Sequence, residues 1–118
     1  MIFSKLLEDE KLFEEYLKEL EETIDIHKEA LTSIRLDIYE IQDRIAELEI
    51  KLSDTEDKEE KKKIVEEIIE LEDEEEALWE TYEEIKMQID ELIEELENLY
   101  DLKESIKEVK ESNEQENN

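Results

Sequence analysis

The sequence predicts an all-α protein: a long antiparallel two-helix hairpin, paired as a coiled coil, that dimerises into a four-helix arrangement. Three observations predict this fold class. The 118 residues include no Gly and no Pro, so tight turns that need a positive φ angle are nearly excluded. Charged residues make up 48% of the chain, which is typical of long helices and not of sheets. Apolar residues recur at alternating steps of three and four, the spacing of a coiled-coil seam.

The first helix is expected at about residues 2–52. Its apolar face begins at Ile2 and becomes regular from Ile24 onward. The regular seam consists of Ile24, His27, Leu31, Ile34, Ile38, Ile41, Ile45, Leu48 and Leu52. A helix of roughly fifty residues would be about 75 Å long, and a helix of that length needs a partner along its whole seam.

A turn is expected at about residues 53–57, because the seam stops after Leu52 and resumes only at Ile64. In one straight helix these twelve residues would turn the second apolar face roughly 120° away from the first. Ser53 and Glu56, three residues apart, have the spacing of a capping box and predict the start of a new helix here. The chain is therefore expected to double back.

The second helix is expected at about residues 57–110, which makes 1–110 a single hairpin domain. Its seam is interrupted once, at Glu75, and consists of Ile68, Leu71, Leu78, Tyr82, Ile85, Ile89, Leu92, Leu96 and Leu99. Residues 111–118 are acidic, rich in Asn and without an apolar anchor, so they are expected to form a disordered tail.

Two registers would match the apolar layers of the two helices. One places Leu52 opposite Ile64, and the other places Ile45 there, one heptad away. We favour the first register, although it brings Phe13 opposite Lys103.

The net charge of −27 constrains the partners of the protein. It comes from 42 acidic and 15 basic residues, and residues 53–118 contribute −19 of it, with 27 acids and 8 bases. Nucleic acid and anionic membrane surfaces would be repelled, whereas a basic protein surface would be attracted. The chain has no Cys and no apolar run of about 18 residues, so neither a disulfide framework nor a membrane span is expected, and we predict a cytoplasmic protein.

The acidic excess is densest in residues 66–101, which hold seventeen carboxylates and one base, Lys86. A net charge of −16 over 36 residues is about one negative charge per 3.4 Å of helix, close to the phosphate spacing of one DNA strand. Coiled-coil surfaces usually mix Glu with Lys, so this excess suggests a binding face for a basic partner. The candidate partner-binding carboxylates are Glu66, Glu67, Glu70, Asp73, Glu74, Glu76, Glu80, Glu83, Glu84, Asp90, Glu91, Glu94 and Glu95.

A second set of candidates is apolar and lies off the predicted seam. Burying such residues would favour a further helix, either from a second copy or from another protein. These candidate interface anchors are Leu36, Tyr39, Ile50, Ile69, Trp79, Ile93 and Tyr100. Tyr82, on the seam, is expected in the core, while Trp79 fits core packing and an interface equally well.

Two polar residues interrupt the seams. His27 lacks the acidic residue three positions earlier that helix-bundle metal sites use, since Ile24 stands there, so we predict that it fixes the register and binds no metal. Glu75 is expected to pair with Arg35 or Arg44 of the first helix; the alternative is that it docks an arginine or a cation from outside.

The sequence indicates no catalytic and no cofactor-binding residues: it has one His, no Cys, and no Gly for a phosphate loop or a nucleophile turn. We interpret the chain as a non-catalytic protein–protein interaction module. Its acidic helix would bind a basic surface, for example that of a nucleic-acid-binding protein, as a nucleic-acid-mimicking inhibitor or a chaperone. The alternative is a self-assembling structural or scaffolding coiled coil that functions as a homo-oligomer.

Overall fold

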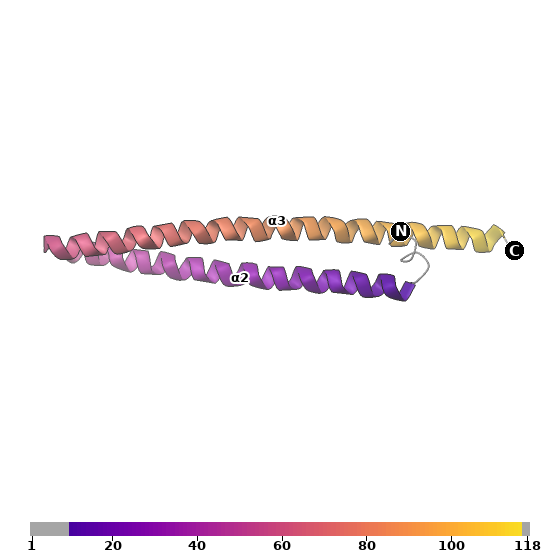
Figure 1. The fold of residues 1–118 in the computed structure, drawn as a ribbon, viewed down its shortest axis with the longest axis horizontal. Coiled ribbons are helices and arrows are strands. Elements are labelled where there is room, and N and C mark those ends of the chain that lie inside the picture. Colours follow the sequence, from indigo (N-terminus) through magenta and orange to yellow (C-terminus); the bar gives the residue numbers. More distant parts are fainter. Residues whose placement is uncertain (1–9, 117–118) are drawn as a thin grey trace. The chain divides into compact units, whose positions relative to one another are not determined.

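The structure, a computed structural model, describes residues 10–116 and contains two long helices (Figure 1). Helix α2 spans Glu10–Asp54 and helix α3 spans Lys58–Glu116. Within the described range only residues 55–57 are not helical, and there is no strand. The all-α helical hairpin predicted from the sequence is thus confirmed, whereas its dimerisation into a four-helix arrangement remains a prediction.

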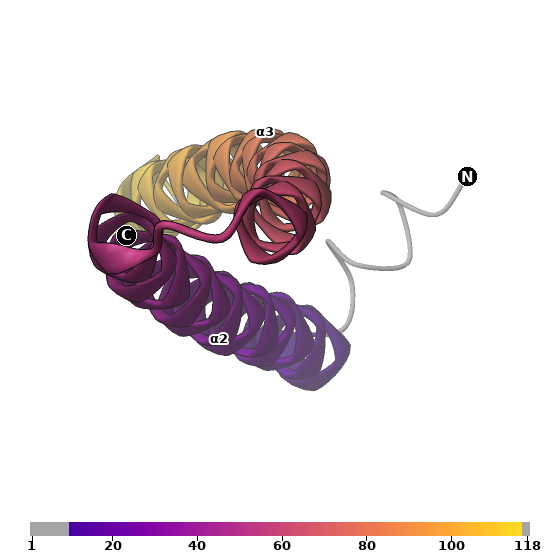
Figure 2. The same cartoon turned by 90° about the vertical axis from the view of Figure 1, so that its left-hand side faces the viewer.

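The chain divides into two units, each built from one stretch of α2 and one of α3. Unit 2 is Lys28–Met87 and includes the turn, which Figure 2 shows end-on. Unit 1 combines α2 up to His27 with α3 from Gln88 onward. In each unit the two stretches run antiparallel, because the chain reverses only once, between residues 54 and 58.

The predicted seams form the cores of both units, and every regular seam residue is buried or half-buried. The core of unit 1 contains the buried residues Phe13, Leu17, Leu20, Ile24 and Leu99, with Leu92, Ile93, Leu96 and Leu102 packed against them. The buried hydrophobic residues of unit 2 are Ile38, Ile41, Leu48, Ile64 and Tyr82. Alternating steps of three and four therefore identified the buried face of each helix correctly.

Two of the three polar contacts between the helices of unit 2 fit the register that we favoured, while the third, between the long side chains of Arg44 and Glu67, adds up to 111. Arg35 donates a hydrogen bond to Tyr82, and Gln42 donates one to Glu75, and the residue numbers of each pair add up to 117. Placing Leu52 opposite Ile64 requires a sum near 116, whereas the alternative register requires a sum near 109.

The conflict expected between Phe13 and Lys103 is relieved in unit 1. Phe13 is 4% exposed, while the Lys103 ammonium forms an ion pair with Glu14, the next residue of α2. A lysine can place its aliphatic stem beside an apolar residue and its charge in water. The two opposed residues are thus compatible.

Asp57 is the N-cap residue before α3, and the predicted capping box of Ser53 and Glu56 does not form. Ser53 lies in the last turn of α2, so it cannot cap α3. Instead, the Oδ1 atom of Asp57 accepts a hydrogen bond from the Glu59 N–H (3.3 Å), and its carbonyl accepts one from Lys61 (2.9 Å). These are the two bonds of an N-cap residue.

The end of α2 is closed by Thr55. Its N–H donates to the carbonyl of Leu52 (3.3 Å), and its hydroxyl donates to the carbonyl of Lys51 (2.6 Å). None of the residues from 10 to 116 has a positive φ angle. The threonine and the aspartate thus end one helix and start the next without the glycine that many turns require.

The helix ends differ from the predicted ones. Helix α3 continues to Glu116, so residues 111–116 of the predicted disordered tail are helical, because no Gly or Pro interrupts a run of residues that helices tolerate. Residues 117–118 of that tail, and the predicted start of the first helix at residue 2, lie outside the described residues. The turn is shorter than expected, at residues 55–57 instead of 53–57.

Candidate protein-interaction surface

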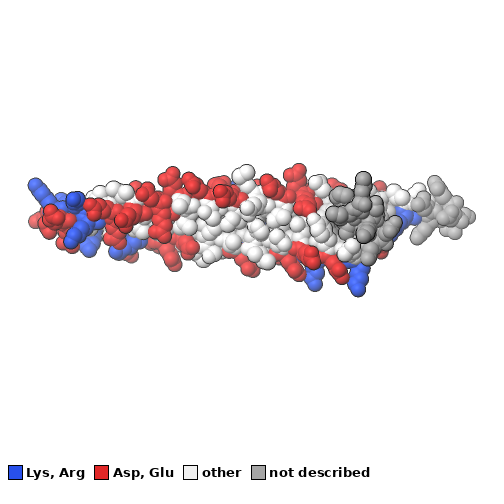
Figure 3. Space-filling view, in the orientation of Figure 1, with Lys and Arg blue, Asp and Glu red and all other residues white. Residues whose placement is uncertain are grey.

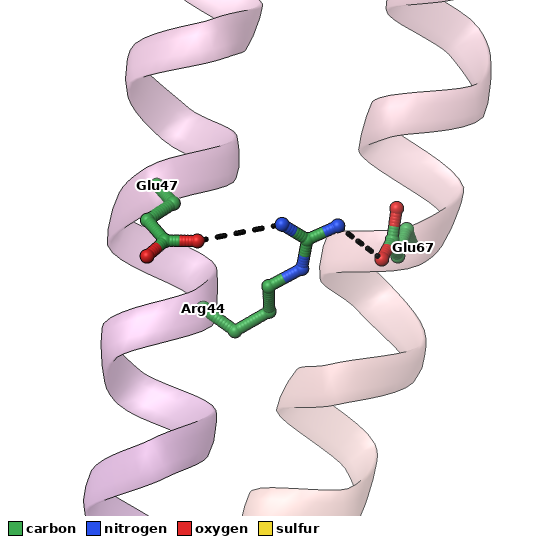
Figure 4. A network of polar contacts seen from close by, with 3 residues as sticks. All are labelled: Arg44, Glu47 and Glu67. Carbon is green, nitrogen blue, oxygen red and sulfur yellow. Dashed lines mark hydrogen bonds and ion pairs between the residues drawn. The ribbon is translucent and has the colours of Figure 1, made fainter.

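One side of unit 2 is marked by Arg44. Its guanidinium bridges Glu67 of α3 (3.2 Å) and Glu47 of its own helix (3.4 Å), as Figure 4 shows. We call this side the acidic flank of unit 2. At about 100° of rotation per residue its carboxylates, on both helices, are Asp37, Glu40, Glu47, Glu67, Glu70, Glu74 and Glu84.

The opposite side of unit 2 carries exposed apolar residues. On α2, Tyr39 lies on the other side of the seam from Arg44, and on α3, Ile69 and Trp79 lie on the other side from Glu67. We call this side the apolar flank. Its residues and their exposed fractions are Tyr39 (51%), Val65 (40%), Ile69 (51%) and Trp79 (39%), whereas Leu36 (57%) and Ile50 (66%) lie on the outer side of α2, opposite the seam.

The Trp79 ring packs against the ring of Tyr82. The two rings pack edge to face, with centroids 5.4 Å apart and an interplanar angle of 77°. The Arg35 guanidinium lies 5.5 Å from the centroid of the Tyr82 ring and donates a hydrogen bond to its hydroxyl, which raises the pKa of Arg35 above its ordinary value. Tyr82 is buried, as predicted, while Trp79 remains partly exposed.

The predicted interface anchors behave in two ways. Six of the seven are exposed, and the seventh, Ile93, is half-buried and packs against the core of unit 1. Tyr100, also in unit 1, is 44% exposed, and its hydroxyl donates a hydrogen bond to Glu21. This bond raises the pKa of Tyr100. Ile93 and Tyr100 thus have contacts within their own unit.

The thirteen predicted partner-binding carboxylates face solvent. All are exposed except Glu67, which is half-buried. Within the described part of the chain, Glu67 is paired with Arg44, and Glu95 accepts a hydrogen bond from the Tyr16 hydroxyl (2.6 Å), which raises the pKa of Tyr16. The remaining eleven have neither an ion pair nor a hydrogen bond to any residue between 10 and 116.

Glu75 is not paired as the sequence predicted. Arg35 and Arg44 contact other residues, and the amide of Gln42 donates to the Glu75 carboxylate instead (3.5 Å). Glu75 is half-buried, so its charge keeps contact with water. An amide is a weaker partner than a guanidinium, but it matches the available space and avoids burying a second charge.

His27 is half-buried, and its Nδ1–H donates to the carbonyl of Thr23 in the preceding turn (2.8 Å). Its polar atom is thus satisfied within α2. Over residues 10–116 no group of three or more His, Cys, Asp or Glu side chains could hold a metal ion.

A groove of about 740 Å³ opens in unit 1, beside Phe13, Tyr100 and Ile106. Lys103, Lys107 and Lys110 also line it. Two of these lysines are used internally: Lys103 pairs with Glu14, and Lys110 with Glu10, which lowers the pKa of the Glu10 carboxyl. Glu104 and Glu111 line the groove as well, so its lining carries charges of both signs.

Comparison with protein-family models, with curated proteins and with solved structures finds no match to this chain. Within residues 10–116, no helix has a stretch apolar and long enough to cross a membrane.

Sequence reasoning missed two features of the surface. Val65 is exposed on the apolar flank, and its position four residues before Ile69 could have indicated that the two share a side. The separation of acidic and apolar residues onto opposite flanks of unit 2 was also missed, because it depends on how the two helices face each other. Figure 3 shows a band of uncharged side chains along the middle of one face, carboxylates along both of its edges, and basic side chains gathered near the turn with a few farther along.

Proposed function

We propose that this chain is a non-catalytic protein–protein interaction module, and that helix α3 binds a basic surface of a partner protein. One observation carries the proposal: eleven of the thirteen candidate carboxylates have no hydrogen-bond or ion-pair partner between residues 10 and 116. The chain thus creates an intense negative potential and does not neutralise it.

In unit 2 the carboxylates of α3 are expected to repel one another. Residues 66–84 of α3 contain eleven carboxylates and no base. Arg44 pairs with one of them from α2, and otherwise this run repels itself, which lowers the stability of the unit. A partner that brings Lys or Arg would relieve that repulsion on binding. Because the charge spacing resembles that of phosphates, nucleic-acid-binding proteins are the partner class that we favour, with the module acting as an inhibitor or a chaperone.

The second candidate function is self-assembly, which the exposed apolar flank of unit 2 favours. A homo-oligomer held by apolar contacts would persist at high salt, whereas a charge-driven complex would dissociate. Light scattering of the chain alone at low and high salt separates the two candidates.

The proposal is tested with the immobilised full chain and a mixture of purified basic nucleic-acid-binding proteins and neutral proteins. We expect the basic proteins to be retained at low salt and released steeply as NaCl is added. A variant with Glu70, Glu74, Glu80 and Glu84 changed to Gln should retain much less of the basic proteins.

The matched control changes four exposed carboxylates of α2 instead, and these are Glu15, Glu19, Glu22 and Glu29. Both variants alter the net charge by the same amount. If the control lost as much binding as the α3 variant, binding would depend on total charge and not on α3. Failure of the wild-type chain to retain any basic protein would overturn the proposal.

A further inference from the structure

The apolar flank of unit 2 has two apolar ends. At one end Trp79 of α3 lies level with Tyr39 of α2, since their numbers add up to 118, close to the observed register, and at the other end lies Ile69 of α3. All three side chains are between 39% and 51% exposed. Ten residues separate Ile69 from Trp79, which is about 15 Å along the helix at about 1.5 Å per residue.

Two carboxylates lie between these ends. Glu72 follows Ile69 by three residues, and Glu76 precedes Trp79 by three, so helical rotation places both on the same side of α3 as the apolar residues. Both are exposed, and neither has an ion pair with any described residue. The flank therefore carries an ordered pattern: apolar, acidic, apolar.

We infer that this flank binds an amphipathic basic helix of the partner protein, an inference that rests on the proposed function and specifies its partner. The helix would present apolar residues at two points about 15 Å apart, one toward Trp79 and one toward Ile69. Between them it would present Lys or Arg toward Glu72 and Glu76. Such a partner would complete a three-helix arrangement with α2 and α3 of unit 2.

A helix suits this surface because two helices lying side by side leave a groove along their whole length, which a third helix can fill. Trp79 is suited to be the main apolar anchor. Its indole is already held against Tyr82, so less conformational entropy is lost when a partner covers it, and tryptophan is enriched among residues that dominate binding energies.

Charge argues against a second copy of the chain as the occupant. Unit 2 contains 22 acidic and 9 basic residues, a net charge of −13. A two-fold pairing of the apolar flanks about their midpoint would bring Glu72 and Glu76 of one copy toward the same residues of the other, and such juxtaposition of like charges is costly. A basic helix converts this repulsion into attraction.

The test uses the full chain and a synthetic peptide of about 18 residues, or about five helical turns. The peptide carries Leu at both ends of one helical face and Arg between them. A second peptide has the same composition in an order that places no stripe on any helical face. Trp79 is the single tryptophan of the chain, so its fluorescence reports binding. We expect the striped peptide to bind about tenfold tighter than the scrambled one, a difference of about 1.4 kcal/mol.

Two substitutions sharpen the test. Ile69→Ser should weaken binding of the striped peptide about tenfold. Circular dichroism of this variant should show unchanged helicity, because Ile69 is 51% exposed. The control is Ala77→Ser, also at an exposed position of α3 but on the acidic flank, and it should leave binding unchanged.

Three results would overturn the inference. If both peptides bound equally while the basic proteins were still retained, charge alone would determine binding, and the proposed function would stand without this partner class. If neither peptide bound to the chain but the basic proteins of the mixture were still retained, the partner surface would not be a helix of this kind. If light scattering showed a dimer that Ile69→Ser dissolved, a second copy would occupy the flank. Loss of the basic proteins as well would count against the proposed function itself.

Discussion

Replacing Ile38 by Ala should destabilise unit 2 far more than replacing Leu36, two residues away on the same helix, by Ala. Ile38 is 0% exposed and lies in the seam between the helices, whereas Leu36 is 57% exposed. The two variants therefore compare a side chain buried between the helices with a partly exposed one at nearly the same position along α2.

The expected difference follows from the burial of the two side chains. Substituting a fully buried Ile, Leu or Met by Ala costs about 2–5 kcal/mol, from lost apolar contact and the remaining cavity. A seam between only two helices can partly collapse, so we expect about 2–3 kcal/mol for Ile38→Ala. Leu36 buries less than half of its surface, and its loss should cost about 0.5 kcal/mol or less.

The measurement is urea unfolding followed by circular dichroism, for both variants and the wild-type chain at equal concentration. The midpoint should fall clearly for Ile38→Ala and hardly at all for Leu36→Ala, with similar slopes. Because the chain consists of two units, unfolding could occur in two steps, and the affected step should be the one that belongs to unit 2.

Equal losses for the two variants would refute the reasoning that α2 and α3 alone form the core of unit 2. They would mean that Leu36 is buried in solution. Repeating the titration over a range of chain concentrations would then show whether a second copy covers it, because the stability of an oligomer rises with concentration.

Three further predictions concern the turn, the charge and a tyrosine. Asp57→Ala should lower the free energy of unfolding in urea by about 1 kcal/mol through loss of the N-cap bond, while Ser53→Ala should change it little. A larger loss for Ser53→Ala than for Asp57→Ala would indicate that Ser53 caps α3 after all. Raising NaCl from about 20 mM to about 500 mM should raise the melting temperature by screening the net charge of −27, and a decrease would show that ion pairs outweigh repulsion. The hydrogen bond to Glu95 raises the pKa of Tyr16 above its ordinary value of 10.0, so its stabilisation is present below that pH and is lost as pH rises through the folded-state pKa. Tyr16→Phe should therefore reduce the loss of stability seen by circular dichroism in alkali, and an unchanged alkaline profile would contradict this account.

The helices and their buried faces were predictable from the sequence because the pattern is local and regular. Steps of three and four fix which side of each helix is apolar, whatever the partner. The eleven-residue gap in the seam after Leu52 was enough to indicate the reversal of the chain. The capping residue was harder, because Asp57 and the Ser53–Glu56 pair both have suitable chemistry, and the choice depends on where α2 ends.

The partners of the polar side chains were less predictable. The sequence pointed to Arg35 or Arg44 for Glu75, since opposite charges attract, yet Gln42 occupies the facing position and the arginines reach Tyr82 and Glu67. Long side chains have several partners within reach, and only the relative rotation of the two helices decides among them. The same rotation decides which exposed residues share a flank, so the apolar flank could not be assembled from either helix alone.

The division into two flanks has a kinetic consequence for the proposed partner. A long-range negative potential accelerates the encounter with a basic protein but is screened by salt, whereas contacts at Trp79 and Ile69 mainly determine how slowly the complex dissociates. Changing Glu70 and Glu74 to Gln should therefore lower the association rate and its salt dependence with little effect on dissociation. Ile69→Ser should speed dissociation and leave the association rate nearly unchanged. Stopped-flow fluorescence of Trp79 with the striped peptide measures both rates, and if either change acted on the other rate, charge and apolar contact would not be separable on this surface.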